Sequence, residues 1–212
     1  LEKYRDKKVV VEFIKKSSAF DFYKRLVEKN EDSKEDIFLI TGDDNKAERK
    51  KIIKEAKDKK RKSMILVATQ VIEAGVDIDM DIGFKNISIL DADEQFLGRI
   101  NRSCKKKNCK VYFFKLDDGG KIYKSDVRIQ GRFTLMNEEM REILKSKNFS
   151  EYYSKILEVL DDFSNKEDEE NIENFRRNKV VQLNFEEINK RLKLITDEMK
   201  TKMIFFSRNI KI

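Results

Sequence analysis

The stretch from Met64 to Arg102 constrains the fold of this 212-residue chain more than any other part. It opens with Met64–Ala68, an apolar run without a polar break, which is typical of a strand buried on both faces. A second apolar run, Ile87 to Leu90, is expected to form the next strand. Polar residues follow both runs, and we expect them at the carboxyl ends of the strands, where open α/β sheets bind ligands.

Two arginines near the end of this stretch are the first candidates for chemistry. If residues 95–103 form a helix, Arg99 and Arg102 lie on one face of it, with Gln95 on the same side. An exposed arginine in a surface ion pair contributes roughly 0–1 kcal/mol, whereas an arginine finger on a nucleotide phosphate contributes about 10³–10⁵ in rate. Spacing alone leaves a solvated basic face and a pair of fingers equally open.

Two motifs in a fixed order separate these interpretations. Residues 69–79 read TQVIEAGVDID and residues 95–102 read QFLGRINR, and together they resemble motifs five and six of superfamily 2 helicases. The longer stretch ILVATQVIEAGVDIDMDIG, followed by QFLGRINR, resembles the CRISPR-associated helicase–nuclease of type I systems, the Cas-three family. Phe96 departs from the family pattern, because most relatives carry arginine at that position.

The resemblance implies roles for particular residues. Thr69 is expected to contact a phosphate of a nucleic acid. Gly75 and Asp77 are expected to lie at a bound ATP, with Asp77 towards the ribose. Three residues are expected to face the γ-phosphate: Gln95, Arg99 and Arg102.

Several groups that such an enzyme needs are missing from this sequence. It has no histidine, which excludes a histidine-metal nuclease centre and a Ser-His-Asp triad within these residues. It also has no GxxxxGK[ST] loop to hold a triphosphate. We therefore expect a fragment whose N-terminal helicase and nuclease domains lie elsewhere in the same polypeptide, where most of the Mg²⁺ that accompanies ATP is held.

Positive charge is concentrated in the half that carries the motifs. Residues 1–115 hold 28 Lys and Arg against 21 Asp and Glu, whereas residues 116–212 hold 19 of each. Asn45 is expected to cap a helix to about residue 60, whose lysines, Lys50 and Lys54 among them, form either a solvated face or a track for single-stranded DNA. The charge also supports a non-enzymatic nucleic-acid-binding module, and another superfamily 2 helicase is the alternative among enzymes.

The composition also bears on the compartment. No apolar run approaches the roughly 20 residues that span a bilayer, and no signal peptide opens the chain. Cys104 and Cys109 are the only cysteines, which fits a reducing cytoplasm, and we interpret them as incidental thiols in a basic turn. The resemblance adds one further partner, the RNA-guided surveillance complex of CRISPR interference.

Strands and helices are expected to alternate along the first half of the chain, with a capping box at Ser18 opening the first helix. The strands are expected near residues 8–14, 37–40, 64–68, 87–90 and 110–115. This alternation predicts an α/β fold, a RecA-like parallel doubly wound sheet over residues 1–116 that serves as the second helicase domain. Residues 117–212 are expected to form a mainly helical accessory domain, with an acidic linker near 161–170 and an amphipathic helix over 185–199.

Overall fold

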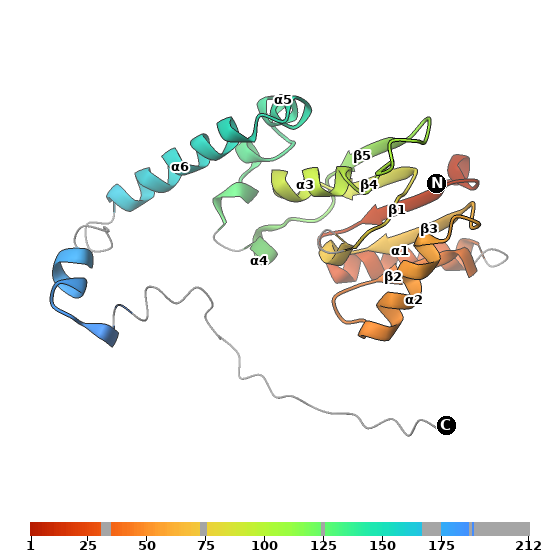
Figure 1. The fold of residues 1–212 in the computed structure, drawn as a ribbon, viewed down its shortest axis with the longest axis horizontal. Coiled ribbons are helices and arrows are strands. Elements are labelled where there is room, and N and C mark those ends of the chain that lie inside the picture. The colour runs from red at the N-terminus through yellow and green to blue at the C-terminus, as the bar shows by residue number, and fades with distance from the viewer. Residues whose placement is uncertain (31–34, 73–75, 124–125, 167–174, 187, 189–212) are drawn as a thin grey trace, which may run out of the picture. The chain divides into compact units, whose positions relative to one another are not determined.

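The structure is a computed structural model, and it describes residues 1–30, 35–72, 76–123, 126–166, 175–186 and 188. The chain divides into two compact units, Leu1–Glu158 and Val159–Ile212. A parallel sheet of five strands forms the centre of the first unit (Figure 1). Its strands are β1 (Lys8–Glu12), β2 (Ile37–Ile40), β3 (Met64–Ala68), β4 (Ile82–Asn86) and β5 (Lys110–Phe114).

Helices connect several of these strands and follow the last one. The longer helices are α1 (Lys16–Lys29), α2 (Lys46–Lys57), α3 (Leu90–Leu97), α5 (Glu138–Ser146) and α6 (Phe149–Lys166). Short helical turns complete the first unit, namely η1 (Glu2–Tyr4), η3 (Gln70–Ile72), α4 (Gly120–Tyr123), η4 (Val127–Ile129) and η5 (Gly131–Phe133).

β1 lies at the centre of the sheet, whose strand order is β2-β3-β1-β4-β5 (Figure 1). It pairs in parallel with two neighbours, so that Val9 lies opposite Ile65 of β3 on one side and Ile82 of β4 on the other. Every residue of β1 is buried, which explains why its sequence does not alternate between apolar and polar residues. The parallel, doubly wound α/β sheet that the sequence predicts is confirmed.

The two faces of the sheet carry separate apolar cores. On one face, Val10 belongs to a cluster that includes Ala56 of α2 and Phe96 of α3. On the other face, Val9 belongs to a cluster that includes Ala19 of α1. Consecutive residues of β1 serve opposite faces because side chains alternate along a strand. Thus α1 covers one face, and α2 and α3 cover the other.

The helix α2 begins where the sequence predicts it. The side-chain oxygen of Asn45 accepts hydrogen bonds from the backbone N–H groups of Ala47 and Glu48, both at 3.0 Å, and its amide donates to the Glu48 carboxylate at 2.8 Å. Such a cap typically contributes about 1 kcal/mol. The expected cap is confirmed, and the helix ends at Lys57.

The helix α1 begins differently from the prediction. Its N-cap residue is Lys15, whose side chain makes no capping bond. Asp117 accepts a hydrogen bond from the backbone N–H of Lys15 at 3.1 Å and another from the hydroxyl of Ser18 at 2.6 Å. The capping box expected at Ser18 is therefore wrong, because a carboxylate that follows β5 supplies the acceptor at this helix start.

The fourth strand lies earlier in the chain than the sequence suggested. β4 ends at Asn86, and the predicted strand over residues 87–90 is instead the connection to α3, which begins at Leu90. Within that connection Ser88 is buried, and its backbone N–H and hydroxyl both donate to Oδ1 of Asp93, at 3.2 and 3.1 Å. An acidic residue in the first turn of a helix is electrostatically favourable, which helps α3 to begin here.

α3 is shorter than the helix predicted over residues 95–103. It ends at Leu97, and Gly98 is its C-cap residue. Asn101 then adopts a positive φ of 50°, so the chain leaves the helical path before Arg102. The condition for both arginines to share one helical face, a helix over residues 95–103, is therefore not met.

The chain after β5 remains bonded to the sheet within the first unit. Asn86 Oδ1 accepts hydrogen bonds from the N–H groups of Leu116 and Asp117, at 3.2 and 2.8 Å. Asp91 of α3 pairs with Arg128 at 3.0 Å and accepts a hydrogen bond from the hydroxyl of Tyr153 in α6. The domain boundary after residue 116 stays a prediction.

The described residues of the second unit are helical for the most part. α6 continues to Lys166, so the first residues of the expected acidic linker are helical. A short π-helical segment, η6, covers Arg176–Val180. Most of the amphipathic helix expected over residues 185–199 lies outside the described residues. Within the part of the chain that the structure describes, no helix has the length and apolar character needed to cross a membrane.

Candidate nucleotide and nucleic-acid site

The connections that precede β4 and β5 meet at the amino ends of the strands. All strands are parallel, so each connection must return from the carboxyl end of one strand to the amino end of the next. Met80, which precedes β4, donates to the carbonyl of Arg99 at 2.9 Å, and Asn101 donates to the carbonyl of Met80 at 2.9 Å. These two bonds join the second half of the first motif to the end of the second.

Three acidic residues alternate with apolar ones along the first of these connections. Ile78 and Met80 are buried in the core, and the acidic residues between and beside them are Asp77, Asp79 and Asp81. This alternation is that of an extended chain, in which successive side chains point to opposite sides. The carboxylates consequently lie together on the side that faces the basic residues of the second connection.

Asp77 forms ion pairs with two basic side chains. Its Oδ1 lies 3.1 Å from Nη1 of Arg102, and its Oδ2 lies 3.5 Å from Nζ of Lys57 at the end of α2. The side chains of Asp77 and Arg102 are 64% and 46% exposed, so both charges are accessible from solvent. The structure thus brings together two of the residues that the sequence placed at the nucleotide.

Arg99, three residues before Arg102, is partly buried. Its Nε donates a hydrogen bond to the carbonyl of Ile72 at 3.1 Å. Ile72 belongs to the first motif, so this bond is a further link between the two motifs. Gln95 is exposed on α3, whereas Phe96 is buried against the sheet. A phenylalanine thus occupies a core position where the family pattern has an arginine.

Asp79 and Asp81 hold the rest of the second connection in place. Asp79 accepts hydrogen bonds from the backbone N–H of Arg102 at 3.0 Å and from the hydroxyl of Ser103 at 2.8 Å. Lys106 forms ion pairs with Asp79 at 3.4 Å and with Asp81 at 2.9 Å. These contacts fix the backbone around Arg102 although its guanidinium is exposed.

A pocket of about 480 Å³ opens at these amino ends. It is lined by residues of both charges, Lys8, Ala56, Lys57, Lys59, Arg61, Lys62, Asp77, Ile78, Asp79, Asp81 and Lys106. Burial, and secondarily the positive charge of Lys106, lowers the pKa of Lys8, whose ammonium donates to the carbonyls of Ala56 and Asp58 at 2.8 Å each. The excess of cations over carboxylates in this lining suits an anionic ligand.

The carboxyl ends of the strands carry other residues. Thr69 follows β3 and is buried, and its N–H donates to the carbonyl of Ile40 at 3.2 Å. The side-chain nitrogen of Gln70 is buried without a hydrogen-bond partner. Gly75 lies outside the described residues. The expectation that all the polar residues gather at the carboxyl ends is therefore wrong, because the crossovers carry Asp77 and Arg102 to the opposite ends.

Lys50 and Lys54 are exposed one turn apart on α2. Lys57, one turn further along, is the lysine of this helix that reaches Asp77. The sequence alone does not distinguish these lysines, so Lys57 was not among the predicted site residues. The alternating DIDMD pattern of residues 77–81 was the signal for Asp79, and it was overlooked.

The structure also contains a buried ion cluster that was not predicted from the sequence. Glu12 of β1 and Lys85 of β4 are register partners, and they form an ion pair in which both side chains are 1% exposed. Asp93 of α3, fully buried, lies with Oδ1 3.8 Å from the Lys85 ammonium. A charged residue inside an otherwise apolar strand was the available signal.

Among the residues that the structure describes, Cys104 and Cys109 lie in no cluster of metal-binding side chains. Both are free, with Cys104 exposed and Cys109 partly buried, and burial raises the pKa of the Cys109 thiol. Among the described residues no group of three or more His, Cys, Asp or Glu side chains could hold a metal ion.

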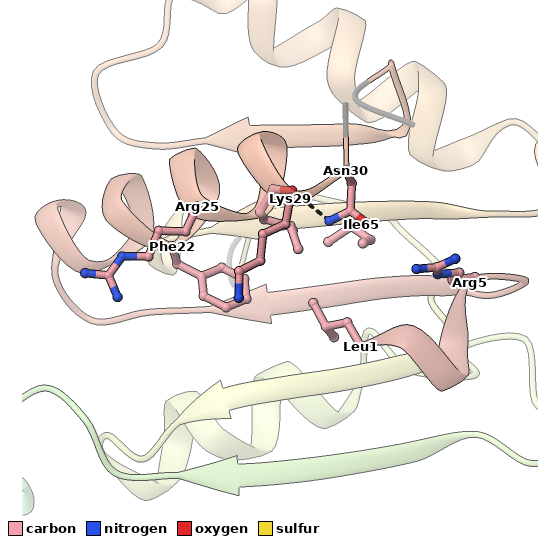
Figure 2. Close-up of a pocket in the computed structure, with 8 residues that line it drawn as sticks. Leu1, Arg5, Phe22, Arg25, Lys29, Asn30 and Ile65 are labelled. Atoms are coloured by element: carbon pink, nitrogen blue, oxygen red, sulfur yellow. Dashed lines mark hydrogen bonds between the residues drawn. The ribbon is translucent and has the colours of Figure 1, made fainter. Parts of the chain in front are cut away.

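A second hollow, of about 440 Å³, lies against α1, on the face of the sheet that this helix covers (Figure 2). Figure 2 shows the basic side chains of Arg5, Arg25 and Lys29 around an apolar floor that includes Phe22 and Ile65. None of the residues predicted to bind nucleotide or nucleic acid lines this hollow. It is therefore separate from the candidate site.

The fold and the joined motifs define a class of protein, the RecA-like domains of helicases. Residues 5–105 match the family model described as CRISPR-associated nuclease/helicase Cas3, C-terminal. Over these residues the chain is similar to the C-terminal portion of the Cas3 family, which supports the resemblance that the two motifs carry. A comparison with curated protein sequences found no match.

Solved structures support the fold. The chain is similar to the crystal structure of T. fusca Cas3 with AMPPNP, with a TM-score of 0.52 and 18% identity, over 88% of this chain and 22% of that one. It is also similar to T. fusca Cas3 with ADP, with a TM-score of 0.52 and 16% identity, over 88% of this chain and 22% of that one. A structure entitled CRISPR RNA-guided surveillance complex, pre-nicking, matches with a TM-score of 0.50 and 17% identity, over 88% of this chain and 25% of that one. The chain therefore spans about a quarter or less of the length of these structures.

Proposed function

We propose that this chain is the C-terminal RecA-like half of an ATP-dependent DNA helicase or translocase of CRISPR interference, acting in the cytoplasm. The observation that carries the proposal is the contact between Arg102 and Asp77, because it joins the two motifs into one exposed, charged site. In this proposal the N-terminal helicase and nuclease domains belong to the same parent protein, and an RNA-guided surveillance complex recruits it. Arg102, Arg99 and Gln95 face the γ-phosphate, while Asp77 with Gly75 meets the rest of the nucleotide.

The residues present fit a triphosphate. Guanidinium and ammonium groups are the donors that phosphate oxygens prefer, and Arg102, Lys57 and Lys106 supply them at or beside one pocket. ATP, when bound, supplies the γ-phosphoryl group, and we assign its Mg²⁺ mainly to the first helicase domain. The cations here stabilise the negative charge of phosphoryl transfer when the cleft closes. Thr69, Lys50 and Lys54 form the track for single-stranded DNA.

The test is Arg99→Ala in the full-length parent protein, measured as DNA-stimulated ATP hydrolysis. We expect kcat to fall about 10³-fold or more, the range known for arginine fingers. Arg132→Ala is the matched control, because Arg132 is exposed and its Nε binds the side chain of nearby Gln130. A hydrolysis rate for Arg99→Ala within a few-fold of the wild type contradicts the assignment.

The charge distribution favours one second candidate, a nucleic-acid-binding module without catalysis. The net charge of +7 belongs to residues 1–115, and α2 exposes several lysines. Such a module gives Arg99 and Arg102 no special role, and its DNA affinity does not depend on nucleotide. DNA binding by the parent protein that is unchanged by ATP analogues supports this candidate over the helicase.

A further inference from the structure

The ion cluster of Glu12, Lys85 and Asp93 lies between α3 and the sheet and joins the helix to β1 and β4. Glu12 is the last residue of β1, and Lys85 lies opposite it in β4. The Lys85 ammonium contacts Glu12 Oε1, lies 3.8 Å from Asp93 Oδ1, and sits 5.6 Å from the centroid of the Phe96 ring. Three charged groups and one aromatic ring therefore meet at a single point between sheet and helix.

Charges buried this deeply are costly. Removing an ion from water costs several kcal/mol in proteins, and a buried pair often stabilises a fold no better than apolar residues of the same size. Stability alone is therefore a weak explanation for the cluster. Ion pairs and hydrogen bonds depend on how the two groups are oriented, whereas apolar contact depends on the buried area and not on orientation. The cluster can therefore favour one orientation of the helix over others.

The cluster specifies how α3 is rotated on the sheet. Asp93 and Phe96, which are three residues apart, both face the sheet, and Gln95 therefore faces solvent. A Cβ atom at Gly83 of β4 would lie 2.7 Å from the Phe96 ring, so β4 has a glycine where the helix comes closest.

The rotation of α3 sets the position of the segment that follows it, residues 98–103, which we name the arginine segment. The N–H of Arg99 donates to the carbonyl of Phe96 at 2.9 Å, and its carbonyl accepts from Met80 at 2.9 Å. A rotation of α3 by one residue, about 100°, would turn Arg99 away from Met80. The arginine segment thus depends on the orientation that Asp93 and Lys85 impose.

We infer that Lys85, held between Glu12 and Asp93, is a positioning residue that orients α3 and through it the arginine segment beside Asp77. The effect on hydrolysis rests on the proposed function, whereas the effect on the arginine segment does not. The cluster itself touches no nucleotide, because its charged groups are buried.

The test uses Asp93→Asn in the full-length parent protein, because asparagine keeps the shape and removes the charge that faces Lys85. Hydrogen exchange reports on the amides of Asn101 and Arg102, which donate to Met80 and Asp79. We expect these amides to exchange at least ten-fold faster, while β3 exchanges at the wild-type rate. Glu94→Gln is the matched control on the same helix, because Glu94 is partly exposed and pairs with Lys147.

Hydrolysis gives an independent readout. We expect kcat of DNA-stimulated ATP hydrolysis in Asp93→Asn to fall about ten-fold per folded molecule, with KM for ATP unchanged. If Arg99→Ala keeps its activity, the proposed function fails, and hydrogen exchange alone decides the positioning role. If Arg99→Ala is inactive but Asp93→Asn exchanges and hydrolyses ATP like the wild type, the positioning inference fails alone.

A second variant tests the inference in case Asp93→Asn does not fold. The triple change Glu12→Gln, Lys85→Met and Asp93→Asn leaves no buried charge, and neutral replacements of buried ion clusters can retain stability. We expect it to fold with β3 protected and the arginine segment in fast exchange. A triple variant whose arginine segment is as protected as the wild type, or which loses protection everywhere equally, overturns the inference.

Discussion

The guanidinium of Arg102 lies 3.1 Å from the carboxylate of Asp77, although the two residues belong to different motifs and different connections of the sheet. Each residue stands near the end of a connection that runs back to the amino ends of parallel strands. The contact is therefore a consequence of topology. The ion pair is exposed, so we expect it to contribute to the function of the site and little to the free energy of unfolding.

We expect Asp77→Asn to separate these two contributions. The free energy of unfolding should change by less than about 1 kcal/mol, because exposed ion pairs contribute about 0–1 kcal/mol. In the parent protein, KM for ATP should rise about 3–10-fold, since a hydrogen bond to the nucleotide contributes roughly 0.5–1.5 kcal/mol. Chemical denaturation and steady-state kinetics measure the two quantities. Asp21→Asn, an exposed change on α1, is the control, and an unchanged KM in Asp77→Asn argues against the ribose contact.

Lys50 and Lys54 can be tested by salt dependence. If both contact phosphates, the double alanine variant of the parent protein should bind single-stranded DNA with a slope of log affinity against log salt that is reduced by about 1.4, because each contact contributes about 0.7. Lys24→Ala combined with Lys145→Ala removes the same charge from exposed positions on α1 and α5. Equal slopes for the two double variants leave Lys50 and Lys54 as a solvated face.

Gly83 should not tolerate a side chain. A Cβ atom there would lie 2.7 Å from Phe96 and 3.0 Å from Ile100, so Gly83→Ala should destabilise the fold by about 1–3 kcal/mol through overpacking. At Gly131 nothing lies within 4 Å of the added atom, and Gly131→Ala should be neutral or stabilise by up to about 1 kcal/mol. Denaturant unfolding of this chain compares the two. Equal effects at both glycines would show that α3 does not press on β4 as the structure has it.

Asp117 should act as a distant cap of α1. Asp117→Ala removes the acceptor for the N–H of Lys15 and for the hydroxyl of Ser18, and it should reduce the free energy of unfolding by about 1–3 kcal/mol. The neighbouring Asp118 is exposed, and its carboxylate accepts a hydrogen bond from the N–H of Gly120 two residues along, so Asp118→Ala should cost under about 1 kcal/mol. If the two variants unfold at the same denaturant concentration, the capping role of Asp117 is refuted.

Cys109 should react at higher pH than an ordinary thiol. Burial raises its pKa, so at any given pH a smaller fraction of Cys109 is thiolate, the reactive form, than for an ordinary thiol with a pKa of about 8.5. Alkylation of Cys109 in a Cys104→Ser variant, followed against pH by mass spectrometry, should show a midpoint above that value. A midpoint at or below about 8.5 contradicts the burial that the structure gives this thiol.

Much of the fold could be predicted because parallel strands are buried on both faces. The runs at β1 and β3 are continuously apolar for that reason, and Asn45 marks a helix start by a local mechanism. β4 was misplaced because its sequence, IGFKN, contains a glycine and a lysine that make sense only beside α3. Gly83 accommodates Phe96, and Lys85 is buried between Glu12 and Asp93.

The sequence named several candidate residues, whose roles stay predictions, but it did not indicate how they are arranged. The motifs singled out Asp77 and Arg102, and the structure places them in contact. The predicted helix over residues 95–103 failed because Asn101 leaves the helical path to reach Met80, a partner far away in the sequence. No local pattern contains that information.

The amino-acid sequence by itself determined most of the strands, β1, β2, β3 and β5, and the start of α2, since apolar runs and caps act over a few residues. It also determined the two motifs that resemble those of superfamily 2 helicases. Only the tertiary structure decided that the acidic and basic ends of two crossovers meet at the amino ends of the sheet, and that a buried lysine lies beneath α3. The physical reason is that parallel pairing and buried charge pairs join residues that are distant in the chain, so their geometry exists only after the sheet has formed.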